Sequence, residues 1–406
     1  MSCNIWTDCE RVPITELLSF IVDNRGKTVP TAPSGYKLIA TNCVTNNTLF
    51  PVYEKIRYLS EETYQTWFRA HPIPGDILFV NKGTPGRVCL VPDPVDFCIA
   101  QDMIALRADD AKIYNKFLFA VLRSREIQQQ IYNTNVGDVI PHFKKQFMDQ
   151  LLIPVPERSI QEQIGDLYYA LSFKAEQNKQ INDNLLALAT ALFEKAIAEN
   201  TPGLIVKSIG DIADVKGGKR LPKGVNFQIV PNDHPYIRVR DLNNACIVQL
   251  SSDFEYVDDE TQKSIARYIV HTSDVIVSIV GTIGLTALVH ESLDTANLTE
   301  NCVKITNLKE VSPEYLLLFL RSTAGQNAIR QATVGAVQAK LPIKNIQAIS
   351  IPTIPEAQRS ELYPQLETLF SAISARLSEN MSLAQTRDLL LPRLMSGEID
   401  VSDIDA

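Results

Sequence analysis

The sequence predicts an α/β (α+β) protein: two similar mixed α/β domains separated by two long antiparallel coiled-coil helices and related by pseudo-twofold symmetry. Three observations lead to this fold class. The chain repeats itself at an offset of 198 residues, each copy mixes strand and helix patterns, and each copy ends in a long amphipathic stretch. The predicted order is a domain at 1–156, a helix at 157–200, a domain at 201–354, and a helix with a tail at 355–406.

The composition indicates a soluble globular chain. It has 406 residues, 45% of them hydrophobic, and a mean hydropathy of −0.03, which fits roughly two to three domains. No run approaches the ~18 apolar residues of a spanning helix, and the N-terminus lacks the order of a secretory signal. The seven cysteines are scattered without a CxxC pair, which favours reduced thiols over a disulfide framework or a zinc site. We therefore expect a cytoplasmic protein without a membrane partner.

The repeat is clearest at a glycine turn. The stretch NKGTPGRVCLV, which begins at Asn81, matches IVGTIGLTALV, which begins at Ile279. The match extends without a gap over 58–154 and gives 22 identities in 97 positions. Upstream the offset falls to 192, so the second copy has a few extra residues near NFQIVPND. A period this long indicates a duplicated domain of about 150 residues rather than a solenoid.

Each copy reads as strands, a turn and helices in the same order. GDILFVNKG and SDVIVSIVG are typical of short buried strands, and GTPG and GTIG are typical of tight turns, so paired strands should form a hairpin. NKFLFAVLRSREIQQQI and PEYLLLFLRSTAGQNAI have helical spacing of apolar residues. The second of these opens with Ser312 as a cap and Pro313 in the first turn.

A proline-containing joint, LLIPVPERSIQEQ or SIPTIPEAQRSE, follows each domain and precedes a long helix. Apolar residues recur there at spacings of three and four, the a/d seam of a coiled coil, and about 40 residues give a rod of about 60 Å. We expect the seams to bury each other; the alternative is that each helix packs on its own domain. The expected contacts join Leu167, Leu171, Leu185 and Leu188 to Leu362, Leu366, Ile373 and Leu377.

Charge is unevenly distributed along the chain. The formal net charge is −8, which argues weakly against a nucleic-acid-coated protein. Residues 201–240, however, hold seven basic and three acidic residues, whereas 241–270 hold six acidic and two basic ones. This segregation fits a local anion-binding surface, and ordinary surface variation is the alternative.

Familiar catalytic motifs are missing from the sequence. It contains no GxxxxGK[ST], GxSxG, GxGxxG or HExxH pattern and no Asn/Asp-Pro-Pro-aromatic motif, and KGGKR at 216–220 lacks the spacing of a nucleotide loop. We therefore predict no catalytic residue, no metal ligand and no cofactor, and a protein that recognises rather than catalyses.

Several segments together resemble the specificity subunit of type I restriction–modification systems. They are GDIADVKGGKRLPKG, YIRVRDL, GTIG, QAKLPIKNIQAISIPTIPEAQ and LLLPRLMSGEI, and the resemblance covers essentially the whole chain. In the first domain, LLSFIVDNRGKTVP is a weaker version of the first segment. The resemblance implies a non-catalytic subunit whose two target-recognition domains each bind one half of a bipartite site on double-stranded DNA.

The same resemblance implies the partners. These would be two N6-adenine methyltransferase (modification) subunits, with restriction subunits in the full complex. The long helices would set the unread gap between the half-sites. Their outer faces, with Gln163, Glu176 and Lys179, would be available to the methyltransferase subunits.

Basic residues near the turns are the candidate DNA contacts, because Lys and Arg neutralise phosphates and Arg can read guanine in the major groove. In the first domain they are Arg25, Lys27, Lys82, Arg87, His142, Lys144 and Lys145. In the second they are Lys216, Lys219, Arg220, Lys223, Arg238, Arg240 and Lys340, with His142 and Lys340 aligned. The turn glycines Gly83 and Gly281 would let backbone amides approach DNA, or would serve the hairpin alone. A solvated surface charge is the alternative for each basic residue.

Two other functions remain open. A non-catalytic protein-binding scaffold with two heads on a coiled-coil spacer agrees with the net charge of −8. An enzyme with an unfamiliar site is disfavoured by the missing motifs. A salt-dependent DNA mobility shift would separate the DNA reader from the scaffold, since phosphate contacts weaken steeply with salt.

Overall fold

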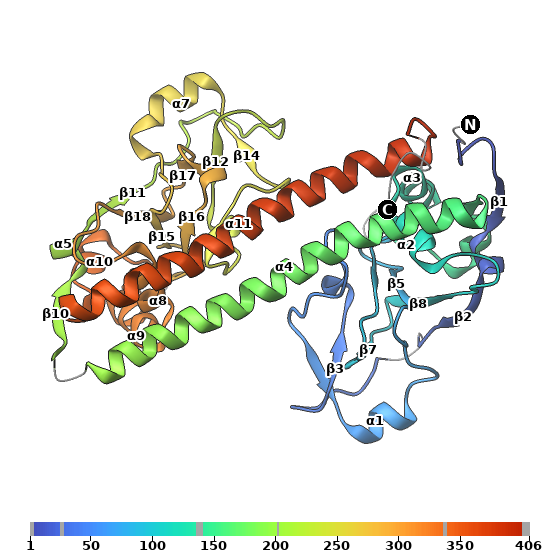
Figure 1. Cartoon of the computed structure of the whole chain (residues 1–406), viewed down its shortest axis with the longest axis horizontal. Helices are drawn as coiled ribbons and strands as arrows, with labels where there is room; N and C mark the ends of the chain where they lie inside the picture. The colour runs from blue at the N-terminus through green and yellow to red at the C-terminus, as the bar shows by residue number, and fades with distance from the viewer. Residues whose placement is uncertain (1–3, 25–27, 135–140, 201–202, 336–338, 400–406) are drawn as a thin grey trace. The chain divides into compact units, whose positions relative to one another are not determined.

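The structure is a computed structural model of the chain, and it describes residues 4–24, 28–134, 141–200, 203–335 and 339–399 (Figure 1). It divides into two compact units: unit 1 comprises 1–178 and 380–406, and unit 2 comprises 179–379. The long helices α4 (Arg158–Glu199) and α11 (Glu356–Met395) each contribute one half to each unit.

Unit 1 contains a four-stranded sheet of order β2-β8-β5-β6, a three-stranded sheet of order β4-β3-β7, and the antiparallel pair β1-β9. Its elements are β1 (Glu10–Pro13), η1 (Ile14–Leu17), β2 (Leu18–Val22), β3 (Tyr36–Ile39), η2 (Thr41–Cys43), β4 (Arg57–Leu59), α1 (Glu61–Thr66), β5 (Ile77–Val80), β6 (Val88–Leu90), β7 (Phe97–Ile99), β8 (Met103–Ala108), α2 (Asn115–Arg123), α3 (Arg125–Thr134), η3 (Lys145–Gln150) and β9 (Leu152–Val155).

Unit 2 has the same plan: a five-stranded sheet of order β11-β18-β15-β16-β13, a three-stranded sheet of order β14-β12-β17, and the pair β10-β19. Its elements are β10 (Ile205–Ser208), α5 (Ile209–Ile212), β11 (Asp214–Gly217), β12 (Pro235–Ile237), α6 (Val239–Leu242), β13 (Ile247–Val248), β14 (Glu255–Tyr256), α7 (Asp259–Ile265), η5 (Ala266–Tyr268), β15 (Val275–Ser278), β16 (Thr286–Val289), η6 (Glu291–Leu293), β17 (Asn297–Leu298), β18 (Cys302–Thr306), α8 (Pro313–Arg321), α9 (Thr323–Ala332), α10 (Ile343–Gln347) and β19 (Ser350–Thr353).

The main sheet of each unit is buried on both faces. Along β5, Ile77 and Phe79 pack in the cluster that contains α2 and the start of α4, whereas Leu78 and Val80 pack against the smaller sheet. Strand β15 of unit 2 alternates in the same way between the helical cluster and the smaller sheet. Because side chains alternate across a strand, an apolar run such as ILFV fits this three-layer order.

The repeat seen in the sequence is a repeat of structure. The predicted hairpins are β5-β6 and β15-β16, and the helices α2 and α8 follow at the same offset. The gapless alignment at 198 residues that the sequence predicted is wrong for one pair of equivalent strands, however. Ile77 pairs with Leu106 and Val275 pairs with Ile305, so β8 and β18 correspond at 199 rather than 198 residues. The loops on either side absorb the one-residue shift.

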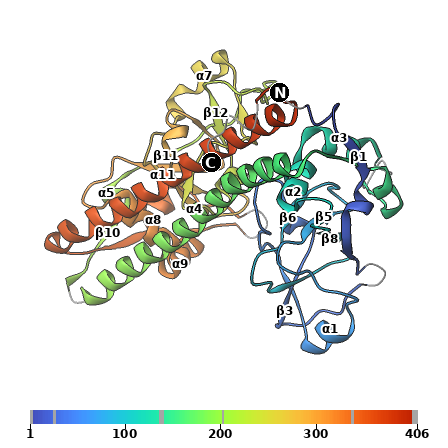
Figure 2. The same ribbon diagram turned by 45° about the vertical axis from the view of Figure 1, so that its right-hand side comes forward.

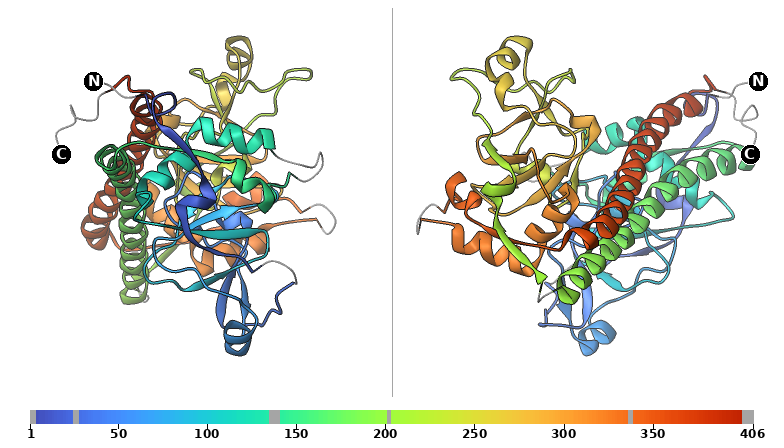
Figure 3. Two further views of the ribbon diagram at one scale, coloured as in Figure 1. Left: turned by 90° about the vertical axis from the view of Figure 1, so that its right-hand side faces the viewer. Right: turned by 60° about the vertical axis from the view of Figure 1, so that its left-hand side comes forward.

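The two long helices pair antiparallel within each unit. In unit 1 the Arg387 guanidinium lies 5.7 Å from the Tyr168 ring centre, and Asn178 donates to Oδ1 of Asn380 at 2.8 Å. In unit 2, Nδ2 of Asn182 donates to the Ile373 carbonyl at 3.4 Å. Figure 2 shows both helices as unbroken ribbons, and the second half of α4 lies beside the first half of α11 (Figure 3). The predicted fold class is therefore confirmed.

The expected leucine pairing is only partly correct. Leu185 packs in the unit 2 cluster that contains Leu366 and Ile373. Leu167, in contrast, packs in unit 1, in the cluster that contains Leu391. Leu171 also lies in unit 1, and Leu188 is 49% exposed. The reason is the antiparallel order, which sets the first half of α4 against the last half of α11.

Candidate nucleic-acid interface

The sheet topology gathers strand ends at one edge of each main sheet. In unit 1, β2 and β5 both run antiparallel to β8 and therefore end at the same edge. In unit 2, β11 and β15 both run antiparallel to β18 and end together in the same way. The loops after these strands hold half of the fourteen candidate DNA-binding residues, and two of these, Arg25 and Lys27, lie outside the described residues. We call these edges the turn edge of unit 1 and the turn edge of unit 2.

The turn edge of unit 1 brings cationic residues from two distant segments together. The glycine turn that leaves β5 begins at Lys82, which forms an antiparallel β-bridge with His142. Phe143 N donates to the Asn81 carbonyl at 2.8 Å, which continues that pairing. Lys82, Arg87, Lys144 and Lys145 are exposed, and His142 is half-buried. Lys145 lies 3.5 Å from Asp23, which directly follows β2.

The turn edge of unit 2 has the same bridge at equivalent positions. Val280 bridges Lys340, and Leu341 N donates to the Ile279 carbonyl at 3.0 Å. The chain leaving β11 adds exposed Lys219, Arg220 and Lys223 to this region. Lys219 lies over the Tyr268 ring at 5.7 Å, and Arg220 pairs with Glu300 at 2.6 Å while staying 79% exposed.

Glycines permit this geometry for two different reasons. A Cβ on Gly218 would lie 2.0 Å from the Thr299 carbonyl oxygen, so only glycine lets the chain pass at this point toward Lys219 and Arg220. Gly281 has φ +79° and no atom within 4 Å of a built Cβ, so its constraint is the backbone conformation and not space. Gly83 has the same open surroundings and a φ of +87°.

Arg238 and Arg240 both form ion pairs with the acidic stretch that follows them in the sequence. Arg238 lies 2.5 Å from Glu255, and Arg240 lies 3.5 Å from the same carboxylate. Arg238 N also donates to Oδ2 of Asp241 at 2.7 Å. The acidic stretch that follows the basic segment in sequence thus folds back onto these two arginines. In the folded chain, the basic and acidic stretches therefore lie next to each other here and partly neutralise each other's charge.

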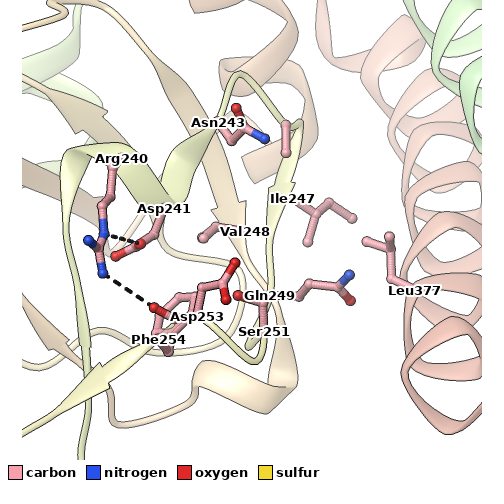
Figure 4. Close-up of a pocket in the computed structure, with 11 residues that line it drawn as sticks. Arg240, Asp241, Asn243, Ile247, Val248, Gln249, Ser251, Asp253, Phe254 and Leu377 are labelled. Carbon is pink, nitrogen blue, oxygen red and sulfur yellow. Dashed lines mark hydrogen bonds and ion pairs between the residues drawn. The ribbon is translucent and has the colours of Figure 1, made fainter. Parts of the chain in front are cut away.

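A pocket of about 630 Å³ lies beside this network, between the loop that contains Arg240 and Leu377 of α11 (Figure 4). Arg240 donates to the Asp253 carbonyl at 3.3 Å and pairs with Asp241, as the dashed lines show. Burial raises the pKa of Asp241 to about 6 despite this cation.

The remaining candidates lie apart from the turn edges or outside the described residues. Lys216 lies within β11 and pairs with Asp214 at 3.1 Å. Arg25 and Lys27 fall in 25–27, outside the described residues. Among the described residues, no group of three or more His, Cys, Asp or Glu side chains could hold a metal ion, and no helix is long and apolar enough to span a membrane.

The repeat also matches Leu122-Arg123-Ser124 with Leu320-Arg321-Ser322, and the arginine of each triplet has an internal role that was not predicted from the sequence. Nη2 of Arg123 donates to the carbonyls of Thr45, Thr48 and Val88 at 3.2, 2.5 and 2.8 Å. Arg321 does the same in unit 2 with Asn244, Ala245 and Thr286. The repeated arginine therefore ties a loop to a strand end, and its recurrence at the same offset was the available signal.

Comparison with known proteins identifies relatives over most of the chain. A family model, the type I restriction modification DNA specificity domain, matches residues 8–187 and again 204–377. The HindI specificity subunit of the type I restriction enzyme of Haemophilus influenzae is 22% identical over 404 residues, which cover 80% of this chain and 86% of the relative. The MjaIX specificity subunit of Methanocaldococcus jannaschii is 20% identical over 81% and 79% of the two chains. The crystal structure of a type I system S subunit from M. genitalium superposes with a TM-score of 0.53 at 16% identity, over 96% of each chain, so the likeness is one of fold.

Proposed function

The chain belongs to the type I restriction–modification DNA specificity family, whose relatives are non-catalytic specificity subunits, and we propose that it reads a bipartite site on double-stranded DNA. One recognition unit binds each half-site. The recognition domains are 1–156 and 201–354, and the helices at 157–200 and 355–406 form the spacer that sets the unread gap.

One observation carries this proposal: the two units present the same turn edge. The bridge between Lys82 and His142 in unit 1 recurs between Val280 and Lys340 in unit 2. Exposed cations beside such a turn can neutralise phosphates and fix the position of a loop over a groove. Two equivalent edges in one chain suit two half-sites on one regular duplex, because protein pseudo-symmetry then matches the arrangement of the site.

The candidate residues divide into two roles under this proposal. The exposed cations of the turn edges, with Arg25 and Lys27 retained from the sequence, contact DNA directly. Arg238 and Arg240 pair with Glu255, so they help to hold their loop as well as supply N–H groups for DNA.

The long helices supply the surface for the partner subunits. In unit 2, Leu188, Leu192, Pro364 and Leu369 line a shallow apolar groove of about 400 Å³. On α4, Gln163 and Lys179 are exposed and Glu176 is half-buried. We assign this surface to N6-adenine methyltransferase subunits, two per specificity subunit, with restriction subunits joining in the full complex and the whole assembly in the cytoplasm.

The test is co-expression of the full chain with the methyltransferase subunit of the same system, followed by mapping of N6-methyladenine in host DNA. The proposal expects methylation at a bipartite site with a fixed gap, and none when the methyltransferase is expressed alone. Methylation at a continuous site would contradict the two-unit reading. A stable complex without methylation would favour a scaffold, and the absence of a complex would refute the assembly.

The protein-binding scaffold retains one supporting feature, the net charge of −8. That charge is compatible with DNA binding, since acidic residues cluster at Asp258, Asp259 and Glu260 around the start of α7. DNA recognition by two similar units explains the repeated turn edge better than a protein-binding scaffold does.

A further inference from the structure

The loop between β11 and β12 in unit 2 differs from its counterpart in unit 1. Both loops are tied to a neighbouring strand by equivalent β-bridges, Ala32 with Tyr58 and Gln228 with Tyr256. After the bridge, the three residues 33–35 lead into β3, whereas the six residues 229–234 lead into β12. The extra residues of the second copy therefore lie partly at the tip of this loop.

The longer tip carries two adjacent large apolar side chains in solvent. Ile229 is 83% exposed and Val230 is 75% exposed, more than any other large hydrophobic side chain among the described residues. In unit 1 the corresponding residues are Pro33, Ser34 and Gly35, which offer no large apolar side chain. Single exposed apolar residues are ordinary, but an adjacent pair at a loop tip marks a contact surface.

The tip is held in place from both sides. The backbones of Gln228 and Tyr256 exchange two hydrogen bonds of 2.9 Å, and Phe227 packs edge-on against Tyr236 at 5.0 Å. On the far side, Nδ2 of Asn232 donates to the Val257 carbonyl at 3.0 Å and to Gln228 Oε1 at 3.1 Å. A contact made by this tip therefore needs little ordering of the chain, which lowers the entropic cost of binding.

The charge of the same loop indicates what the tip meets. The loop, residues 218–234, contains three basic residues, Lys219, Arg220 and Lys223, and one acidic residue, Asp233. The loop also starts at the turn edge of unit 2, where β11 ends. A cationic loop with an apolar tip complements a groove that has anionic rims and apolar groups on its floor. The major groove of DNA has this character, because thymine presents its C5-methyl group there.

We propose that Ile229 and Val230 are specificity-determining residues of unit 2 and contact the methyl group of a thymine in its half-site. The inference rests on the proposed function and adds a base preference to it. Unit 1 lacks an equivalent tip, so the two units read their half-sites by different chemistry on the same scaffold.

The test uses the complex of the full chain with its methyltransferase subunits and the bipartite site mapped for the wild type. Each thymine of that site is replaced in turn by deoxyuridine, which removes only the methyl group, and duplex binding is measured. The wild type should lose about fourfold in affinity at one thymine of a single half-site, the worth of one buried methyl group. The double variant I229S/V230S should bind thymine and deoxyuridine equally at that position.

A matched control is Val206→Ser, which removes another exposed valine of unit 2 (65% exposed) on β10 and should keep the thymine dependence. The inference is overturned if I229S/V230S keeps that dependence, if the half-site contains no thymine, or if the variant no longer assembles, which would assign the tip to a protein partner. Absence of a bipartite site for the wild type would instead refute the proposed function itself.

Discussion

Removing lysines from the turn edge of unit 2 should change the salt dependence of DNA binding without changing the preferred sequence. Lys219 and Lys223 are exposed on the loop after β11, and the Lys219 ammonium lies over the Tyr268 ring at 5.7 Å. If each neutralises one phosphate, the double variant K219A/K223A lowers the slope of log K against log salt by about 1.8. Between about 50 and 200 mM salt, the wild type then loses about 12-fold more affinity than the variant.

The assay is fluorescence anisotropy of a labelled duplex at several salt concentrations, with the assembled complex. Because phosphate contacts carry no sequence information, cognate and non-cognate duplexes should weaken by similar factors. Lys195→Ala with Lys309→Ala is the matched control, since both lysines are exposed and lie outside the turn edges. An unchanged slope in K219A/K223A would refute the phosphate assignment, and a changed base preference would show that these lysines read bases.

Glu300 allows the same electrostatics to be tested in the opposite direction. Its carboxylate pairs with Arg220 at 2.6 Å, and this pairing helps to hold the pKa of Glu300 below its usual value, against the effect of burial. Glu300→Gln removes one negative charge and frees Arg220, which is already 79% exposed. Affinity at low salt should rise, and the salt slope should steepen by about 0.9 if Arg220 gains a phosphate. Weaker binding by this variant would mean that Glu300 positions Arg220 for its contact.

Three further predictions concern the frame that supports the turn edges. Arg123→Ala should lower the free energy of unfolding by about 3 kcal/mol or more in urea denaturation, because three carbonyls lose a charge-assisted donor; a loss below about 1 kcal/mol would contradict this role. Gly165→Ala should destabilise by about 2 kcal/mol despite the better helix propensity of alanine, since its Cβ would lie 2.6 Å from Phe117 N, and an unchanged urea midpoint would contradict that packing. Asp241 has a folded pKa of about 6, above the ordinary 3.8, so it binds its proton more tightly in the folded state than in the unfolded state. As pH rises from about 4 to 6, the free energy of unfolding of the wild type should therefore fall relative to that of Asp241→Asn. Parallel curves of unfolding free energy against pH would contradict the raised pKa.

The features that the sequence predicted are those encoded locally or by repetition. Short apolar runs identified the strands at 77–80 and 275–278, and glycine at 83 and 281 identified the turns, because both signals depend on a few adjacent residues. The long helices followed from apolar spacing in the same way. What escaped prediction depends on partners distant in sequence: the spacing of apolar residues in α4 does not say which turn of α11 each residue meets.

The DNA-binding candidates show the same limit. Lys82 and His142 were chosen separately as basic residues, and only the sheet topology brings them into one bridge. Arg238 was chosen in the same way, and its ion pair with Glu255, seventeen positions further along the chain, depends on the fold and was not predicted. The exposed tip at Ile229 was visible only as an insertion, since exposure depends on what the rest of the fold leaves uncovered.

Buried amides between the long helices help to fix how these helices pair. Asn178 is fully buried and bonded to Asn380, and Asn182 donates to a carbonyl of α11 at 3.4 Å. An axial slip of one helical turn, about 5.4 Å, would break the side-chain bond between Asn178 and Asn380. Leucines alone would tolerate such a slip far better, because one apolar contact can replace another. We infer that the polar pairs sacrifice some helix-pair stability to fix one register.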